Sequence, residues 1–228
     1  MRRCRPLLGT LVEIELLDDD SVAMESAFSA MVNVEQRMNF YNPQSELSKL
    51  NRGAVSQAIS VSSELLEVLV QVQSLFERTS GVFDASTSLT DGGSVVVDSL
   101  NRTVTYERPL QLNLGGIAKG YAVDQAVREL QSAGVSGGIV NAGGDLRYFG
   151  DYFPTVWVKH PRTHAPIFPI RDLQASALAT SSPSDTISVS VGAPTCMIAD
   201  ALTKVVLALG DDSIPILAQY DAVAFFTS

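Results

Sequence analysis

The sequence predicts an α+β fold in which antiparallel, hairpin-rich sheets pack with helices in a single compact unit. Two observations lead to this prediction. Strand-like segments come in pairs joined by short turns, as in antiparallel hairpins, and amphipathic helical segments are interspersed among these pairs. The 228 residues are 46% hydrophobic and 18% charged, so the chain has enough apolar surface to form a core. We expect one domain over residues 1–228.

The first predicted elements are a strand and two helices. Residues 10–16 alternate between apolar and polar side chains, which predicts a half-buried strand. After a turn and an N-cap at residues 18–21, apolar residues recur at helical spacing up to Met38. Ser62 is placed to cap the second helix, which carries an apolar stripe and ends before Gly81.

The next elements are hairpins and two further helices. Residues 94–98 and 103–107 flank one turn, and residues 138–140 and 146–149 flank a glycine-rich one. Apolar residues three and four positions apart, followed by a glycine, predict each helix. The remaining predicted elements are helices at about residues 119–133 and 197–209 and strands at residues 155–158, 186–191 and 222–226.

The charge of the chain limits its partners. Sixteen Lys and Arg against 25 Asp and Glu give a formal net charge of −9. An acidic surface repels a phosphate backbone, so we expect no nucleic-acid partner. A small anion could still bind through backbone N–H groups, a metal ion or a few placed cations. No apolar run approaches the roughly 20 residues of a transmembrane segment.

The most informative segment is the run LNLGGIAKGYAVD over residues 112–124. Gly115 and Gly116 allow a ligand to approach the backbone closely, and the N–H groups at the following helix start favour an anion. The chain has neither a Walker loop nor a dinucleotide fingerprint. The alternative is a plain strand-to-helix turn that needs glycine for packing.

Two shorter segments also contain candidate binding residues. The turn NAGGD from Asn141 to Asp145 could present consecutive N–H groups to an anion, although a simple hairpin turn is the alternative. Asp200 and Thr203 share a helix face and offer the hard oxygen ligands that suit Mg²⁺. The alternative here is an ordinary surface ion pair between Asp200 and Lys204.

In chain order, these and further segments resemble the ApbE family of FAD:protein FMN transferases. The matching segments extend from Arg5 to Gly210, and their order makes the resemblance more specific than any one motif. They are RPLLGT from Arg5, YNPQSELSKLN from Tyr41, SGVFD from Ser80, LGGIAKGYAVD from Leu114, NAGGD from Asn141, ATS from Ala179 and ADAL from Ala199.

The resemblance implies an ApbE-like, T-fold-like domain that takes FAD as substrate with Mg²⁺. FMN would pass to a Thr or Ser hydroxyl of an acceptor protein, with release of AMP. The implied flavin-nucleotide contacts are Leu8, Tyr41, Val82, Phe83, Asp84, Gly115, Gly116, Lys119, Tyr121, Asn141, Gly143, Gly144 and Asp145. The implied metal ligands are the Ala118 carbonyl, the Asp200 carboxylate and Thr203, and the implied catalytic residues are Asp200 and Lys119.

The sequence departs from the family pattern at the metal position. Many members have Thr four residues beyond the Asp, where this chain has Lys204. Thr203, one position earlier, could substitute as a ligand. Alternatively, Lys204 could supply positive charge in place of one ligand.

Two loop segments of the family are short or absent. A Ser-His-x-x-Asp-Pro-Arg-Thr-Gly-like segment, whose His is the favoured proton-transfer residue, should follow residues 179–181, but a strand follows Asp185 directly. The insertion expected after Asp84 is also short, at residues 85–93. Either this sequence omits loops that the natural chain has, or the homologue lacks them and binds FAD as a catalytically defective relative. An FAD pyrophosphatase is a further alternative.

The first residues and the family resemblance predict different locations in the cell. Residues 1–9 lack the apolar stretch of an export signal, which predicts a cytoplasmic protein if this start is native. Family analogy instead implies a periplasmic or membrane-associated protein. The sequence predicts no oligomeric state.

Overall fold

The computed structural model describes residues 1–55, 57–87, 95–163, 165–170 and 175–227. The chain divides into two compact units. Unit 1 comprises Met1–Val32 and Lys119–Ser228, and unit 2 comprises Asn33–Ala118. The boundaries lie within helix α1 (Ser21–Met38) and at the start of helix α4 (Ala118–Ser132). The single domain predicted over residues 1–228 therefore stays a prediction.

A seven-stranded antiparallel sheet forms the centre of unit 1, in the order β1-β2-β6-β7-β10-β11-β12. Its strands are β1 (Arg2–Leu7), β2 (Thr10–Leu16), β6 (Gly137–Ala142), β7 (Asp145–Gly150), β10 (Ala177–Ser184), β11 (Ile187–Ala193) and β12 (Val223–Thr227). Three connections are two-residue hairpin turns, at residues 8–9, 143–144 and 185–186. These short turns fix the register of the strands that they join.

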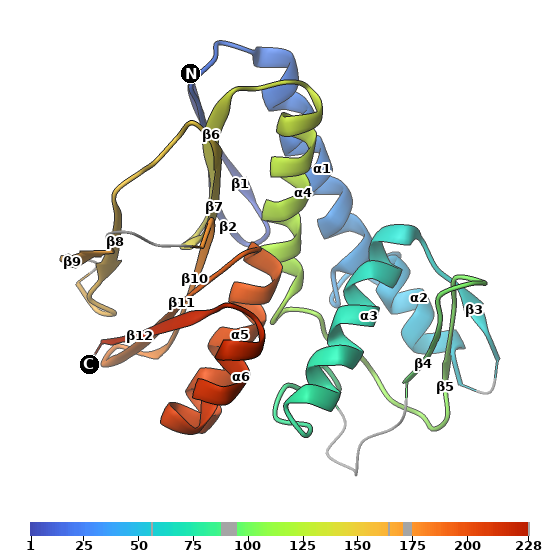
Figure 1. The fold of residues 1–228 in the computed structure, drawn as a ribbon. Coiled ribbons are helices and arrows are strands. Elements are labelled where there is room, and N and C mark those ends of the chain that lie inside the picture. Colours follow the sequence, from blue (N-terminus) through green and yellow to red (C-terminus); the bar gives the residue numbers. More distant parts are fainter. Residues whose placement is uncertain (56, 88–94, 164, 171–174, 228) are drawn as a thin grey trace. The chain divides into compact units, whose positions relative to one another are not determined.

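Helices α4 and α5 (Cys196–Leu209) lie on one face of this sheet, and the hairpin of β8 (Val156–Lys159) and β9 (Pro166–Ile170) lies on the other (Figure 1). A 3₁₀ turn (Gly210–Ser213) and the short α6 (Ile214–Gln219) follow α5. Within the described residues, no helix is long and apolar enough to cross a membrane.

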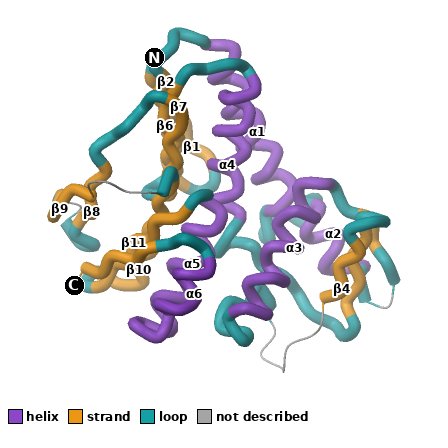
Figure 2. Tube along the Cα trace, viewed as in Figure 1, coloured by secondary structure: helices purple, strands orange, loops and turns teal. Residues whose placement is uncertain are grey.

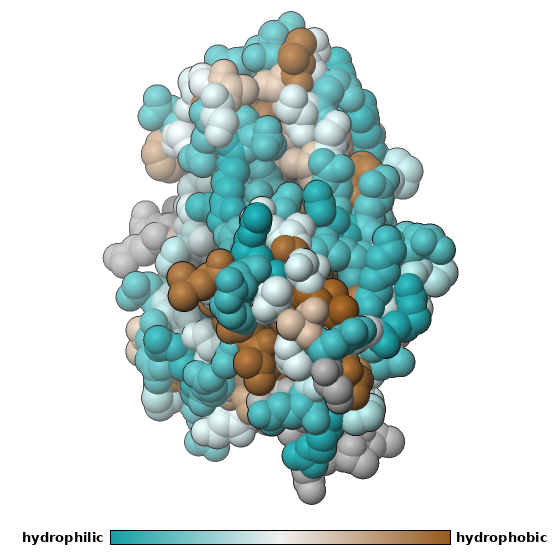
Figure 3. All heavy atoms as spheres, turned by 90° about the vertical axis from the view of Figure 1, so that its right-hand side faces the viewer, coloured by the Kyte–Doolittle hydropathy of each residue, from teal (hydrophilic) through white to brown (hydrophobic). Residues whose placement is uncertain are grey.

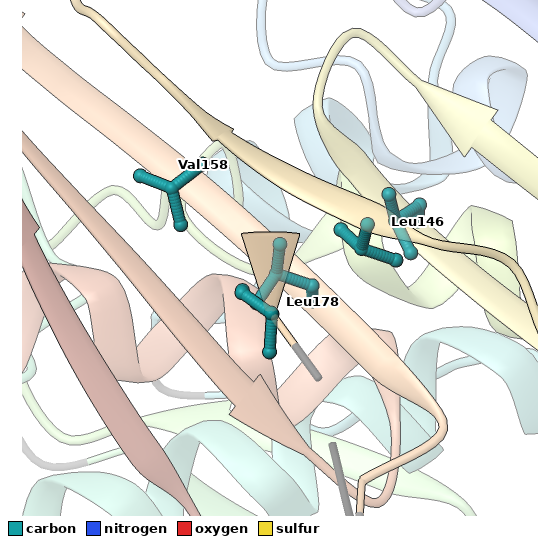
Figure 4. Packing of buried hydrophobic residues seen from close by; sticks show 5 residues of the cluster. Leu146, Val158 and Leu178 are labelled. Carbon is teal, nitrogen blue, oxygen red and sulfur yellow. The ribbon is translucent and has the colours of Figure 1, made fainter. Parts of the chain in front are cut away.

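Side-chain alternation along β7 separates the two faces. Leu146 packs with Val158 and Leu178 in an apolar cluster on the β8–β9 side (Figure 4). Because neighbouring side chains of a strand point to opposite faces, Asp145 faces the helices. The sheet therefore presents a carboxylate to α4 and α5 and an aliphatic side chain to the β8–β9 hairpin.

Unit 2 combines α2 (Glu46–Gly53) and α3 (Ser63–Arg78) with a three-stranded sheet (Figure 2). The sheet has the order β3-β5-β4, with strands β3 (Ile59–Ser60), β5 (Thr103–Tyr106) and β4 (Val95–Asp98). The Ser45 side chain caps α2, and Glu46 accepts hydrogen bonds from the backbone N–H and hydroxyl of Ser62, the cap of α3. The SELS motif therefore joins two helix starts.

The predicted α+β class with antiparallel sheets and packed helices is confirmed. Asp20 caps α1 through hydrogen bonds from the N–H groups of Val22 and Ala23, and Ser62 caps α3, as predicted. The helices expected at 119–133 and 197–209 begin one residue earlier than predicted. Residue 94, expected to start a strand, lies outside the described residues. The elements that sequence patterns missed include β1, β3, β9, β10, α2 and α6.

Candidate functional site

The residues assigned to a flavin-nucleotide site divide between the two units. Unit 1 contains Leu8, Lys119, Tyr121, Asn141, Gly143, Gly144, Asp145, Asp200 and Thr203. Unit 2 contains Tyr41, Val82, Phe83, Asp84, Gly115, Gly116 and Ala118.

Helices α4 and α5 approach each other closely at Gly120. A Cβ at this position would lie 2.2 Å from the Cys196 carbonyl oxygen and 2.9 Å from Asp200 Cβ. Such contacts are far inside van der Waals distance, so only glycine fits here. The Gly120 N–H donates a hydrogen bond to Asp200 Oδ2 over 3.1 Å. The motif on α4 therefore positions the Asp200 carboxylate on α5.

Asp124, four residues along α4, fixes the start of α5. Its carboxylate accepts hydrogen bonds from the N–H groups of Cys196 (3.0 Å) and Met197 (2.8 Å) and from the Arg147 guanidinium (2.8 Å). Burial raises the pKa of Asp124, and these three partners oppose the rise. No sequence pattern indicates this role of Asp124, because the N–H groups that it accepts from lie more than 70 residues away in the chain.

Two carboxylates and two ammonium groups lie close together in unit 1. Lys119 Nζ is 2.8 Å from Asp145 Oδ2, and Lys204 Nζ contacts Asp200 Oδ1. Asp145 and Asp200 are each about 1% exposed. Charge–charge interactions also link Asp145 with Asp200 and with Lys204. We call Lys119, Asp145, Asp200 and Lys204 the charge cluster.

The charge cluster shifts the pKa values of two of its members. Burial raises the pKa of Asp145 to about 6, and the Asp200 carboxylate adds to the rise, while Lys119 opposes it. Burial by itself lowers the pKa of Lys119, but the carboxylates of Asp145 and Asp200 outweigh it, so the pKa of Lys119 is raised. Lys119 is therefore an ammonium ion at neutral pH.

The raised pKa of Asp145 predicts a pH dependence of stability. Between about pH 4 and pH 6 the folded chain holds a proton on Asp145 that the unfolded chain has lost, so stability falls as pH rises. Relative to Asp145→Asn, which has no such titration, the wild type should lose on the order of 2 kcal/mol across this window. Urea unfolding of both proteins from pH 4 to pH 7 measures the difference, and a flat or rising difference would contradict the assignment.

The glycine-rich turn at residues 143–144 is a two-residue hairpin turn between β6 and β7. Both glycines have positive φ, and a Cβ at Gly143 would lie 2.3 Å from Thr10 Oγ1. The Gly144 N–H donates to Asn141 Oδ1 over 3.0 Å. The backbone here is thus a simple hairpin turn, as the alternative predicted. Anion binding by the turn stays a prediction.

Leu8 and Tyr121 are the other two flavin contacts predicted in unit 1. Leu8 lies in the β1–β2 turn with a φ of 55°, beside Gly9. Tyr121 is fully buried, so its ring does not reach the surface. A flavin contact at either residue stays a prediction.

The predicted metal ligands do not fit a divalent ion as they are arranged. The Thr203 hydroxyl is buried, donates to the Asp200 carbonyl oxygen (2.7 Å) and is hydrogen-bonded with Ser181 Oγ (2.7 Å). The Asp200 carboxylate is bonded to Gly120 and Lys204, and a ligand role for the Ala118 carbonyl stays a prediction. No group of three or more His, Cys, Asp and Glu that could hold a metal occurs among the described residues. The ion pair expected as the alternative is present, but Asp200 is buried rather than on the surface.

The predicted contacts in unit 2 are mostly on loops. Tyr41 is 84% exposed, and its ring meets Phe40 edge-on at 5.4 Å between centroids. Phe83 is buried below the more exposed Val82. The Asp84 carboxylate accepts hydrogen bonds from the N–H (2.7 Å) and hydroxyl (2.9 Å) of Ser86. The face in Figure 3 is largely polar, with apolar residues showing in small groups.

Asn51, the last residue of the SELSKLN segment, is a positioning residue whose role no sequence pattern indicates. Its side chain donates to the Leu112 carbonyl oxygen (2.9 Å) and accepts from the Leu112 N–H (3.0 Å) and the Tyr106 hydroxyl (2.9 Å). It thereby holds the start of the 112–124 run. Farther along that run, the Gly115 N–H donates to Asn113 Oδ1 (2.9 Å).

Two cavities in unit 2 adjoin predicted contact residues. One of about 230 Å³ lies beside α3 and is lined by Asp84, Leu69 and Leu112 among others. Another of about 310 Å³ is lined by Tyr41, Asn51 and neighbouring residues. The first cavity is smaller than the roughly 300–1,000 Å³ of typical small-molecule sites, and the second is a shallow depression.

Comparison with known proteins assigns the family. The ApbE family model matches residues 8–92 and 87–186. The chain belongs to the ApbE family. Among curated relatives, the FAD:protein FMN transferase of Haemophilus influenzae is 24% identical over 63% of this chain and 52% of its own length. That of Rhodobacter capsulatus is 27% identical over 66% of this chain and 35% of its own length. The matched part thus spans about half, or less, of these curated relatives.

Solved ApbE structures share the fold. The ApbE protein of Thermotoga maritima has a TM-score of 0.83 at 22% identity, covering 99% of this chain and 93% of that one. The flavin transferase ApbE from Vibrio cholerae has a TM-score of 0.82 at 20% identity, covering 99% and 92%. At these identities the likeness shows the fold alone.

The two departures from the ApbE pattern can be followed along the chain. The family match changes segment at residues 87–92, where a shortened insertion was predicted, but residues 88–94 lie outside the described part. At the other departure, β10 and β11 form a hairpin whose turn is residues 185–186. In the described residues 175–227, the chain therefore passes between these strands without the His-containing segment.

Proposed function

We propose that this chain transfers FMN from FAD to a Thr or Ser hydroxyl of an acceptor protein and releases AMP. Membership of the ApbE family carries this proposal, since the match covers most of the motifs and the curated relatives are named FAD:protein FMN transferase. In the reaction, the acceptor oxygen bonds to the phosphorus on the FMN side. The bond from that phosphorus to the AMP oxygen breaks, and the acceptor hydroxyl loses its proton.

Lys119 is a cation of unit 1 that the FAD pyrophosphate could contact. Its side chain is 30% exposed, and its raised pKa keeps it charged, so an anion could reach it. The Asp145 carboxylate would hold the ammonium group in place. In unit 2, the exposed Tyr41 ring offers an aromatic face for a flavin.

The resemblance implies that the transfer reaction depends on Mg²⁺, and this dependence has to be measured. A divalent ion at a pyrophosphate would polarise its oxygens. Asp200 and Thr203 are already engaged with other groups of the chain and do not form a metal site as they are arranged.

A second candidate function is FAD binding without transfer. The direct β10–β11 hairpin favours it, because the family's proton-transfer His belongs to the segment that this hairpin lacks. A catalytically defective homologue would keep the nucleotide contacts and lose turnover.

Incubation with FAD and several candidate acceptor proteins, with Mg²⁺ or with EDTA, tests the proposal. Covalent flavin on the acceptor, read by in-gel fluorescence and by the mass added to the intact protein, is the expected result. Absence of labelled acceptor across all candidates would overturn the transferase reading. Free FMN with AMP would instead indicate a pyrophosphatase, and bound FAD without turnover would indicate the defective homologue.

Asp200→Ala should reduce transfer by about 100-fold or more, because it removes the carboxylate that holds Lys204 beside α4. The matched control is Asp212→Ala, which removes an exposed carboxylate from the 3₁₀ turn after α5. Transfer rates and melting temperatures of both variants separate loss of function from loss of fold. Wild-type activity in a folded Asp200→Ala protein would mean that transfer needs neither this carboxylate nor its ion pair with Lys204.

A further inference from the structure

The Asp200 carboxylate is already paired with a cation, the Lys204 ammonium group. Lys204 follows it by one helical turn on α5, and its Nζ contacts Asp200 Oδ1 and lies 3.0 Å from the Asp200 carbonyl oxygen. The other carboxylate oxygen accepts the Gly120 N–H. Both oxygens of this buried carboxylate are therefore engaged within unit 1.

The charge cluster is balanced without a metal ion. Asp145 and Asp200 contribute two negative charges, and Lys119 and Lys204 contribute two positive charges. A divalent ion on Asp200 would add two positive charges beside two ammonium groups at a carboxylate that is about 1% exposed. Such uncompensated charge is costly at a buried position.

The site also has too few oxygen ligands for Mg²⁺. Mg²⁺ demands near-octahedral oxygen coordination, and the Lys204 ammonium, at the position where many family members have Thr, has no lone pair to donate. Thr203 Oγ1 is buried and already hydrogen-bonded to the Asp200 carbonyl oxygen and to Ser181 Oγ, which leaves it at most one free lone pair for a metal ion.

We propose that Lys204 takes the place of the divalent cation on Asp200, so that this chain binds FAD without a metal at that carboxylate. The statement about FAD rests on the proposed function. The statement about Asp200 does not, because it concerns the protein without nucleotide.

Titration with Mn²⁺ in the absence of nucleotide tests the first statement, with free Mn²⁺ followed by electron paramagnetic resonance. Lys204→Thr supplies a hydroxyl and removes the ammonium group, and should bind Mn²⁺ about 10-fold more tightly than wild type or better. Lys204→Met removes only the charge and shows whether repulsion alone excludes the metal, so it should also bind more tightly than wild type. Lys159→Thr, at an exposed position on β8, is the matched control and should behave as wild type. Equal Mn²⁺ affinity in wild type and both Lys204 variants would overturn the proposal.

FAD affinity in EDTA and in Mg²⁺, measured by flavin fluorescence, tests the second statement. Wild type should bind FAD equally in the two buffers, whereas Lys204→Thr should lose about 10-fold in EDTA and recover in Mg²⁺. A wild-type requirement for Mg²⁺ would overturn the inference. Absence of FAD binding in both buffers would overturn the proposed function and the statement about FAD, while the Mn²⁺ result would still decide the role of Lys204.

Discussion

Gly120→Ala should lower the free energy of unfolding by about 3 kcal/mol or more. The added Cβ would lie 2.2 Å from the oxygen and 2.6 Å from the carbon of the Cys196 carbonyl. These are backbone atoms at the start of α5, and no side-chain rotation can relieve the clash. The two helices would have to separate, which would also stretch the hydrogen bond from the residue 120 N–H to Asp200.

Urea unfolding measures this loss, and Gly53→Ala provides the matched control on α2. A Cβ at Gly53 would meet the flexible end of the Ile59 side chain at 3.2 Å. Because Ala favours a helix over Gly by about 1 kcal/mol, this variant should be as stable as wild type or slightly more so. If the two substitutions had equal effects, close helix contact would not be the reason for Gly120.

Sequence patterns predicted those helices and turns that are determined by a few neighbouring residues in the chain. The Ser62 cap and the turn at residues 143–144 each depend on a few adjacent residues. Strand β10 was missed because its Ala and Ser residues show no alternation, although it is a central strand between β7 and β11. Helix α2 was missed because eight residues are too few for a clear apolar period.

The candidate site was predictable only where its contacts are short-range in the chain. The pair Asp200–Lys204 follows from the i,i+4 spacing of a helix. Its burial does not, because that depends on Gly120, 80 residues away. Likewise, Asn51 binds Leu112 across 61 residues, and no pattern in either segment indicates the other. Such long-range bonds arise from the topology, which the sequence specified only as a class.

Asp124→Ala should cost about 3–5 kcal/mol, because it breaks a buried ion pair and also removes the acceptor of the first two N–H groups of α5. Asp124 is 2% exposed, and the Arg147 side chain is 20% exposed. The variant would leave that guanidinium without its carboxylate and two N–H groups of α5 without an acceptor. Guanidinium chloride unfolding measures the loss.

Two further variants separate the two roles of Asp124. Ser62→Ala removes only a cap, from α3, and should cost about 1 kcal/mol. Arg147→Met removes only the cation and keeps the hydrogen bonds from α5 to Asp124, so it should cost less than Asp124→Ala. If Arg147→Met cost as much as Asp124→Ala, the ion pair would account for the whole effect, and the helix start would not depend on Asp124. The expected order instead makes Asp124 the residue that joins the motif on α4 to the helix that carries Asp200 and Lys204.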